Sequence, residues 1–278
     1  MTNWEQNLRA DLARNAERFA DAHGLTAYRS RGKTILFPSH GLRHGNFIDA
    51  SYRAILGNRS WARRLEKRHN RPDALPEDRR HDAMELDSSN SSDALLMNCF
   101  CYPGSCTRIF SSLLPGLTNG PVEFGVPGRV PLSDGQPDRT ELDMRAGTVI
   151  FESKLTEDGF GSTEKKSMER YRDLNSVFDV RLLPTEDRRL LHYQLLRNVL
   201  AAAAHGYHFV LLCDARRPDL LHSWWDVHGA IRSADLRSRS RFLLWQEVTD
   251  ACPGPLRDFL HEKYGFGGPA TASFDPDP

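Results

Sequence analysis

The segment at 148–155 reads TVIFESKL, an apolar run that carries a glutamate and a lysine two residues apart. Side chains alternate between the two faces of an extended strand, so Ile150, Glu152 and Lys154 are expected to share one face. Charged groups inside an apolar strand cost free energy unless they are satisfied by partners. The segment therefore predicts a central strand whose charged pair belongs to a functional site, rather than an ordinary surface strand.

A second acidic residue, Asp143, ends the preceding strand candidate at 141–144, and the short turn at 145–147 predicts a hairpin. The hairpin would bring Asp143 beside Glu152. Two facing carboxylates repel each other unless a cation lies between them, and Mg²⁺ or Mn²⁺ prefers oxygen ligands of this kind. Lys154 could then orient or deprotonate a water molecule, or stabilise a pentacovalent phosphate. The alternative is a plain salt bridge from the lysine to either acid at a strand edge.

The remaining patterns predict an α/β domain. Helical spacing or helix-start signals predict helices at about 3–22, 49–69, 94–100, 185–204, 218–231 and 255–263. Strand candidates lie at 34–37, 122–126, 141–144, 148–155 and 209–213. The uninterrupted apolar run at 209–213 is typical of a buried central strand. The order helix, strand hairpin, helix, strand indicates a mixed sheet clamped by helices.

The charge balance argues against a protein held on nucleic acid mainly by a global positive field. The chain has 37 basic and 37 acidic residues and a net charge of zero. Two basic stretches, at 53–81 and 232–241, interrupt this balance. Either stretch alone is read as a solvated face, whereas together they could flank a nucleic-acid groove.

The five cysteines are an odd number in a chain of 278 residues and argue against a disulfide framework. Cys99, Cys101 and Cys106 lie close together, but their spacing favours buried thiols over a zinc site. No apolar run approaches the roughly 18 residues of a membrane span, and the N-terminus lacks the apolar core of a secretory signal. We therefore expect a cytoplasmic protein without a membrane partner.

Three blocks of the sequence carry a family resemblance: SSDALLMN at 91–98, TELD at 140–143 continuing to FESKLTEDGFG at 151–161, and YQLLRN at 193–198. With these blocks the chain resembles the PD-(D/E)XK nuclease superfamily and, more narrowly, a bacterial family of restriction endonuclease-like proteins. The resemblance covers roughly 85–250, and its middle block is the most specific. It implies a restriction-endonuclease-like mixed sheet flanked by helices, and a Mg²⁺-dependent endonuclease that cleaves duplex DNA in defence or DNA processing.

The resemblance also implies roles for individual residues. Asp143 and Glu152 would bind the metal ion, Lys154 would act on the water or the transition state, and Gln194 would face the catalytic strand from a helix. Superfamily members often add a glutamate, for which we favour Glu123.

Several of these residue assignments have alternatives elsewhere in the sequence. Asp138, in a literal Pro-Asp pair within a loop, could replace Asp143, and Glu85 could replace Glu123. Tyr193 and Arg197 are one helical turn apart, so Arg197 could contact phosphate. Glu157 could either organise the turn that follows it or touch the metal.

The expected organisation is a helical N-terminal region and linker at 1–84, the nuclease-like domain at 85–265, and a flexible tail at 266–278. Cleavage of both strands by one site per subunit would suggest a homodimer. Two other functions compete with this prediction: a catalytically silent nucleic-acid-binding or regulatory protein on the same fold, and a nuclease directed at RNA or at free ends.

Overall fold

A computed structural model describes residues 3–30, 34–68 and 84–267. The α-helices are α1 (Trp4–His23), α2 (Asp49–Gly57), α3 (Arg59–Ala62), α4 (Ser92–Cys101), α5 (Ser105–Leu113), α6 (Lys165–Met168), α7 (Leu174–Val177), α8 (Tyr193–His205), α9 (Pro218–Ala230), α10 (Ala234–Arg239), α11 (Trp245–Ala251) and α12 (Gly254–Tyr264). Two 3₁₀ helices are η1 (Arg63–Glu66) and η4 (Glu85–Asp87). The strands are β1 (Tyr28–Arg29), β2 (Ile35–Leu36), β3 (Ser39–His40), β4 (Arg43–His44), β5 (Val122–Pro127), β6 (Glu141–Ala146), β7 (Val149–Ser153), β8 (Ser162–Glu164), β9 (Thr185–Glu186), β10 (Arg189–Leu191), β11 (His208–Cys213) and β12 (Ser240–Leu244).

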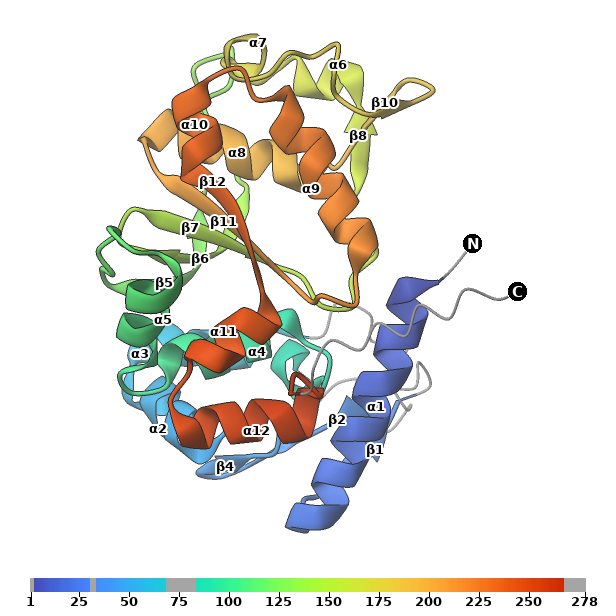
Figure 1. Cartoon of the computed structure of the whole chain (residues 1–278), viewed down its shortest axis with the longest axis vertical. Coiled ribbons are helices and arrows are strands. Elements are labelled where there is room, and N and C mark those ends of the chain that lie inside the picture. The colour runs from blue at the N-terminus through green and yellow to red at the C-terminus, as the bar shows by residue number, and fades with distance from the viewer. Residues whose placement is uncertain (1–2, 31–33, 69–83, 268–278) are drawn as a thin grey trace.

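The largest sheet has five strands in the order β12-β11-β7-β6-β5. Strand β11 runs parallel to both β7 and β12, whereas β5, β6 and β7 are antiparallel neighbours. Helices α8 and α9 lie on one side of this sheet, and α4 and α11 lie on the other (Figure 1). The predicted mixed sheet flanked by helices is therefore confirmed.

Strand β7 is the middle strand of this sheet, and all five of its residues are buried. Val149 and Phe151 pack into a core that includes α4 and α5, whereas Ile150 packs into the opposite core with α8 and α9. The alternation read from the sequence is thus confirmed for the apolar residues of the strand.

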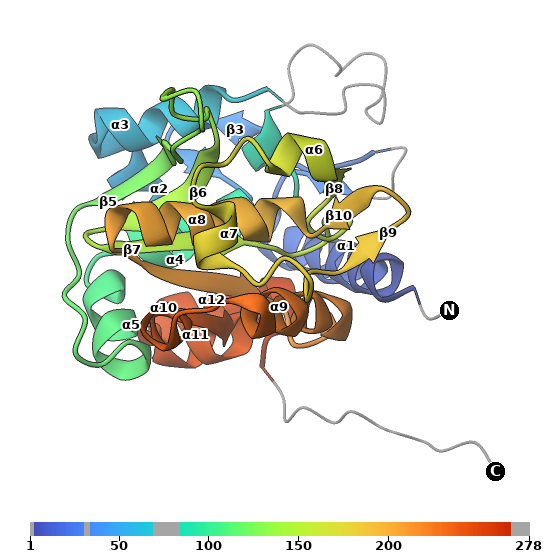
Figure 2. The same ribbon diagram turned by 90° about the horizontal axis from the view of Figure 1, so that it is seen from above.

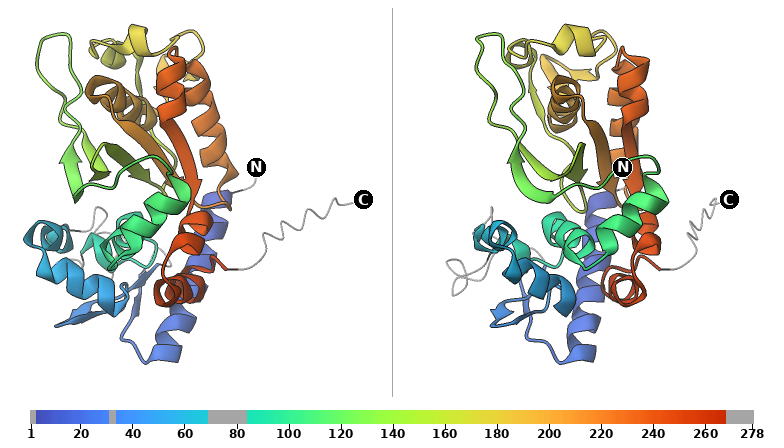
Figure 3. Two further views of the ribbon diagram at one scale, coloured as in Figure 1. Left: turned by 60° about the vertical axis from the view of Figure 1, so that its left-hand side comes forward. Right: turned by 90° about the vertical axis from the view of Figure 1, so that its left-hand side faces the viewer.

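The N-terminal helix is part of the first of these cores. Leu8 and Leu12 of α1 pack in one apolar cluster with Phe151 of β7 and Tyr264 of α12. Figure 3 shows α1 (blue-violet) crossing α12 (dark red, seen nearly end-on) below the sheet. The cluster thus joins residues from both sides of the boundary expected at 84/85, and that division stays a prediction. No helix within the described ranges is long and apolar enough to cross a membrane.

The long helix predicted from residue 185 is wrong in its first part. Strands β9 and β10 form a hairpin there, β10 also pairs with β8, and α8 begins only at Tyr193. Asp187 in the hairpin turn and His192 before the helix adopt positive φ angles of 51° and 59°, which interrupt a helix. Leu190 and Leu191 fit a helical pattern, yet Leu190 is buried as a strand residue.

Two further boundaries differ from the prediction. The single helix expected at 49–69 is divided at Asn58, whose side chain accepts hydrogen bonds from the first backbone amides of α3. The turn expected at 145–147 lies at 147–148, because Ala146 still pairs with Val149 and Gly147 takes a φ of 61°. Residues 69–83, at the end of the expected N-terminal region and linker, and most of the expected C-terminal tail lie outside the described residues.

Candidate active site

The β6–β7 hairpin places Asp143 next to Glu152. Met144 pairs with Phe151 and Ala146 with Val149, so continuing the register by one residue sets Asp143 opposite Glu152. The Asp143 carboxylate also accepts a hydrogen bond from the backbone amide of Ser153, with a nitrogen–oxygen distance of 2.8 Å. The two acids predicted to face each other therefore lie side by side in the structure.

Glu152 and Lys154 are buried, with exposed fractions of 4% and 5%, and each has several partners. Lys154 Nζ lies 2.9 Å from Glu152 Oε1 and donates a hydrogen bond of 2.8 Å to Gln194 Oε1. Asn198, one turn further along α8, donates to Glu152 Oε2 at 2.6 Å. The expected salt bridge exists, but it lies at the centre of the sheet rather than at a strand edge.

Electrostatics distinguish Asp143 and Lys154 from surface charges. Burial of the Asp143 carboxyl group, together with the negative charge of Glu152, raises the pKa of Asp143 well above the usual range. Burial alone would lower the pKa of Lys154, but the surrounding carboxylates, Glu152 first among them, raise it above the usual value. The site therefore holds excess negative charge around one ammonium group.

These residues line a pocket of about 500 Å³. Asp143, Glu152, Lys154 and Gln194 all contribute to it, so the structure brings these four predicted residues together. The pocket also receives residues from the N-terminal region, from η4 and the start of α4, and from the loop after β7: Arg9, Lys67, Glu85, Ser88, Asn90, Ser91, Ser92, Asp93, Ser153, Thr156, Glu157 and Asp158.

The rival acids lie in different places. Glu123 does not line this pocket, and its carboxylate bonds instead with Arg145 on the neighbouring strand. Glu85 does line the pocket and pairs with Lys67 at 2.8 Å. Asp138 lies in a separate pocket, where it accepts hydrogen bonds from Thr140 and Tyr171. The placement therefore favours Asp143 over Asp138 and gives no support to Glu123 as a metal ligand.

Sequence reasoning did not single out Asp93 or Asn198 as site residues, although both lie within the blocks that carry the resemblance. Asp93, in the first turn of α4, contributes to the raised pKa of Asp143 and forms an ion pair with Arg64. Asn198 repeats the spacing of Gln194 by one helical turn, and this was the signal that could have identified it. Glu157 lines the pocket and its side chain accepts hydrogen bonds from Leu155 N and Ser92 Oγ, neither of which lies in the turn that follows it, so both alternatives for Glu157 stay open.

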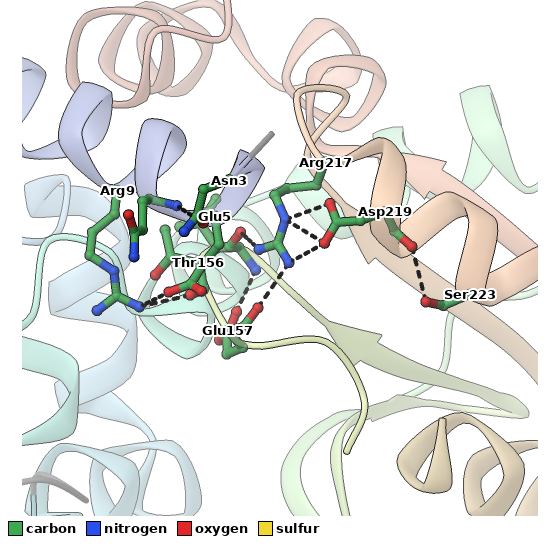
Figure 4. A network of polar contacts seen from close by, with 10 residues as sticks. Asn3, Glu5, Arg9, Thr156, Glu157, Arg217, Asp219 and Ser223 are labelled. Carbon is green, nitrogen blue, oxygen red and sulfur yellow. Dashed lines mark hydrogen bonds and ion pairs between the residues drawn. The ribbon is translucent and has the colours of Figure 1, made fainter. Parts of the chain in front are cut away.

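The chain leaving β7 is fixed by side chains from distant elements. Trp245 Nε1 donates to the carbonyl oxygen of Lys154 at 3.0 Å. Arg217, which is 1% exposed, donates to the carbonyls of Leu155 and Glu157, both at 3.0 Å. Arg9 of α1 donates to the carbonyl of Thr156 at 3.0 Å (Figure 4). Four consecutive carbonyls after the strand are thus held by hydrogen bonds.

The donor set fits a hard divalent cation. Within the described residues, no three His, Cys, Asp or Glu side chains form a metal-binding group. Mg²⁺, however, keeps several waters and needs only one or two carboxylates besides substrate oxygens. The negative charge of Glu152 raises the pKa of Asp143, and a cation bound between the two carboxyl groups would favour the ionised form of both. The residues that would hold the ion are therefore Asp143 and Glu152.

The cysteines give no sign of a zinc site. All five thiols are free, and Cys99 and Cys101 are buried. Burial raises the pKa of both thiols well above the usual range, which disfavours the thiolate that zinc requires. The interpretation as buried thiols agrees with this arrangement.

Comparison with known proteins gives one match. The model of a family described as Restriction Endonuclease associating with ARP matches residues 21–265. No curated protein and no solved structure matches the chain. The matched segment contains every residue that lines the candidate pocket except Arg9.

Proposed function

Because the chain belongs to the family of restriction endonucleases associating with ARP, we propose that it is a divalent-metal-dependent nuclease that hydrolyses phosphodiester bonds of duplex DNA. The observation that carries this proposal is the buried Glu152–Lys154 pair next to Asp143, in a pocket at the centre of the sheet. If Glu152 and Lys154 formed only a structural salt bridge, there would be no reason for a second carboxyl group, Asp143, to lie beside them with a raised pKa.

In the proposed reaction, Asp143 and Glu152 hold a Mg²⁺ or Mn²⁺ ion. When bound, this ion would neutralise phosphate charge and lower the pKa of water. The hydrogen bonds to Ser153 N and Asn198 Nδ2 fix the two carboxylates in the pocket. Both therefore are expected to lose little freedom on binding the ion.

Lys154 is the cation that this chain itself supplies to the reacting phosphate. Its raised pKa keeps the ammonium group protonated near neutral pH, so it favours a role in stabilising negative charge over one as a general base. Gln194 accepts one of its hydrogen bonds and orients the ammonium group. Gln194 is thus a positioning residue, whereas Lys154 would touch the substrate.

The test is a nicking assay on supercoiled plasmid with Mg²⁺, Mn²⁺ or EDTA. Wild type should nick DNA only with a divalent ion, and Asp143→Ala, Glu152→Ala and Lys154→Ala should each lose this activity. Asp138→Ala should still nick DNA in a divalent-ion-dependent way, because Asp138 lies in another pocket and is not expected to hold the ion. Cleavage by Asp143→Ala or Lys154→Ala at the wild-type rate would refute the assignment.

The same preparation separates the competing functions. A nucleic-acid-binding or regulatory protein on this fold would bind DNA without cleaving it in either metal. A nuclease for RNA or for free ends would prefer RNA, single strands or linear duplex over supercoiled plasmid. The intact set of two acids and one lysine favours cleavage, and the shared family favours DNA.

A further inference from the structure

A second pocket, of about 610 Å³, lies on the other flank of α8. It is formed where the connection between β5 and β6 meets the segment around α6 and the first turns of α8. Figure 2 shows α6 and α8 close together at this end of the molecule. The residues that give the pocket its character are three arginines and two tyrosines: Arg139, Arg170, Arg197, Tyr171 and Tyr193.

The arginines have unused hydrogen-bonding capacity. Arg139 and Arg170 are exposed, and within the described ranges their guanidinium groups form no hydrogen bond or ion pair. Arg197 stacks on the ring of Tyr193, with 4.7 Å from the guanidinium carbon to the ring centroid. Its Nε atom is buried and has no hydrogen-bond partner. Two exposed guanidinium groups without a protein partner, and a third whose Nε makes no hydrogen bond, leave several donors at one pocket available to an anionic ligand.

Asp134 and Asp138 also line the pocket and offset only part of this charge, because Asp138 forms an ion pair with Arg197 and, within the described residues, neither acid forms one with Arg139 or Arg170. The nearest oxygen of Asp138 lies 3.8 Å from Arg197 Nε, beyond hydrogen-bonding distance. The Asp138 carboxylate already accepts hydrogen bonds from Thr140 N at 2.9 Å and from Tyr171 Oη at 2.6 Å. Tyr171 Oη in turn lies 3.1 Å from Tyr193 Oη. These hydrogen bonds fix the positions of the two tyrosines, and the Tyr193 ring in turn supports the guanidinium group of Arg197.

The pocket lies next to the candidate active site, because α8 contributes residues to both. Gln194 and Asn198 contact Lys154 and Glu152 from one face of the helix. Tyr193 and Arg197, one residue earlier in each turn, occupy the neighbouring face. A helix with its side chains is about 10 Å wide. Because the two pockets lie on adjacent faces of one such helix, they are within a few nucleotides of each other along one strand.

We propose that this pocket, defined by Arg139, Arg170 and Arg197, binds the phosphate backbone of the DNA substrate a few nucleotides from the cleaved bond. The choice of DNA as ligand rests on the proposed function. The planar guanidinium fork matches phosphate oxygens in two-point contacts. Such contacts fix the register of a protein on a duplex and carry no sequence information. The pocket would therefore set which phosphate reaches Lys154, in a chain whose zero net charge supplies no global attraction.

The experiment measures binding without cleavage. A short fluorescein-labelled duplex is titrated with the full-length protein in EDTA, and anisotropy gives the Kd over a series of salt concentrations. The test variant is Arg139→Gln/Arg170→Gln, and the matched control is Arg108→Gln/Arg257→Gln. Arg108 on α5 and Arg257 on α12 are also exposed and also unpaired within the described ranges, and neither lines the pocket.

Each phosphate contact contributes about 0.9 to the slope of log Kd against log salt, so the test variant should lose about two units of slope. The control should retain the wild-type slope, and thermal melting should show all three proteins folded. Equal slopes for the test variant and wild type would overturn the proposal. So would equal losses in both variants, which would indicate a diffuse charge effect, or tighter binding of duplex RNA than of DNA.

This result is independent of the cleavage test. If wild type fails to nick plasmid with Mg²⁺ while the test variant loses its slope, the nuclease proposal fails and the phosphate pocket stands. If wild type nicks plasmid and the slope does not change, the nuclease proposal stands and the pocket assignment fails.

Discussion

Replacing Arg217 by methionine should destabilise the protein strongly, although Arg217 is not a candidate for chemistry. The guanidinium group is 1% exposed and donates to the carbonyls of Leu155 and Glu157 and to the carboxylate of Asp219 (Figure 4). A methionine side chain fills much of the same buried space but has no hydrogen-bond donor. Both carbonyls lie just beyond Lys154, in the chain that leaves β7, and both would lose these hydrogen bonds.

The magnitude follows from these contacts. A buried carbonyl left without a partner costs about 1–3 kcal/mol, and this cost falls on the Leu155 carbonyl, because the Glu157 carbonyl keeps a hydrogen bond of 2.8 Å from Gly159 N. Asp219 adds little, because its carboxylate is 40% exposed and can be solvated. Against a net stability of about 5–15 kcal/mol for a folded domain, the loss is a large fraction.

Urea denaturation followed by circular dichroism measures this loss. The matched control is Arg181→Met, because Arg181 binds Asp179 with a similar two-point pair two residues away but is 83% exposed. The control should unfold at the wild-type urea concentration. A free energy of unfolding for Arg217→Met within about 1 kcal/mol of wild type would refute the argument that the Leu155 carbonyl depends on Arg217.

Three further results are expected. Asn198→Ala should lower plasmid nicking by about 10–100-fold while the protein stays folded, because Glu152 loses the donor that orients it; unchanged nicking would contradict this role. Glu123→Gln should leave nicking unchanged, since that carboxylate bonds Arg145 outside the pocket, and a loss of activity would restore it as a candidate ligand. Burial lowers the pKa of His44 below the usual 6.5, so the unfolded chain takes up a proton that the folded protein does not. Its contribution to stability should be complete above about pH 6.5 and decrease as the pH falls towards the folded-state pKa. Urea midpoints of wild type and His44→Gln at several pH values would measure this, and an identical pH dependence in both would contradict it.

The part of the site that could be predicted from the sequence depends on local geometry. Strand alternation alone places Glu152 and Lys154 on one face. The hairpin could also be predicted, but the register that sets Asp143 opposite Glu152 comes from the turn at 147–148, which lies later than the predicted turn at 145–147. Buried apolar runs also gave β7 and β11 nearly to their ends, because a central strand leaves little freedom in its composition.

The rest depends on contacts between distant parts of the chain. Asp93, Lys67 and Arg9 reach the pocket from positions 61 to 145 residues before Lys154 in the chain, and no local pattern specifies that packing. The β9–β10 hairpin was missed for a different reason. Its leucines suit a helix as well as a strand, and pairing with β8 decides between the two.

The position of Lys154 shows why the site cannot be reduced to its three central residues. Burying an ammonium group is costly, and the cost is offset only if its carboxylate and amide partners stay within hydrogen-bonding distance. Those partners lie on β7 and α8, and the chain just beyond Lys154 is held by Trp245, Arg217 and Arg9. Arg9 lies before the segment that the family model matches. Through Arg9, helix α1 therefore contacts the loop that leaves the candidate catalytic strand from outside the matched segment.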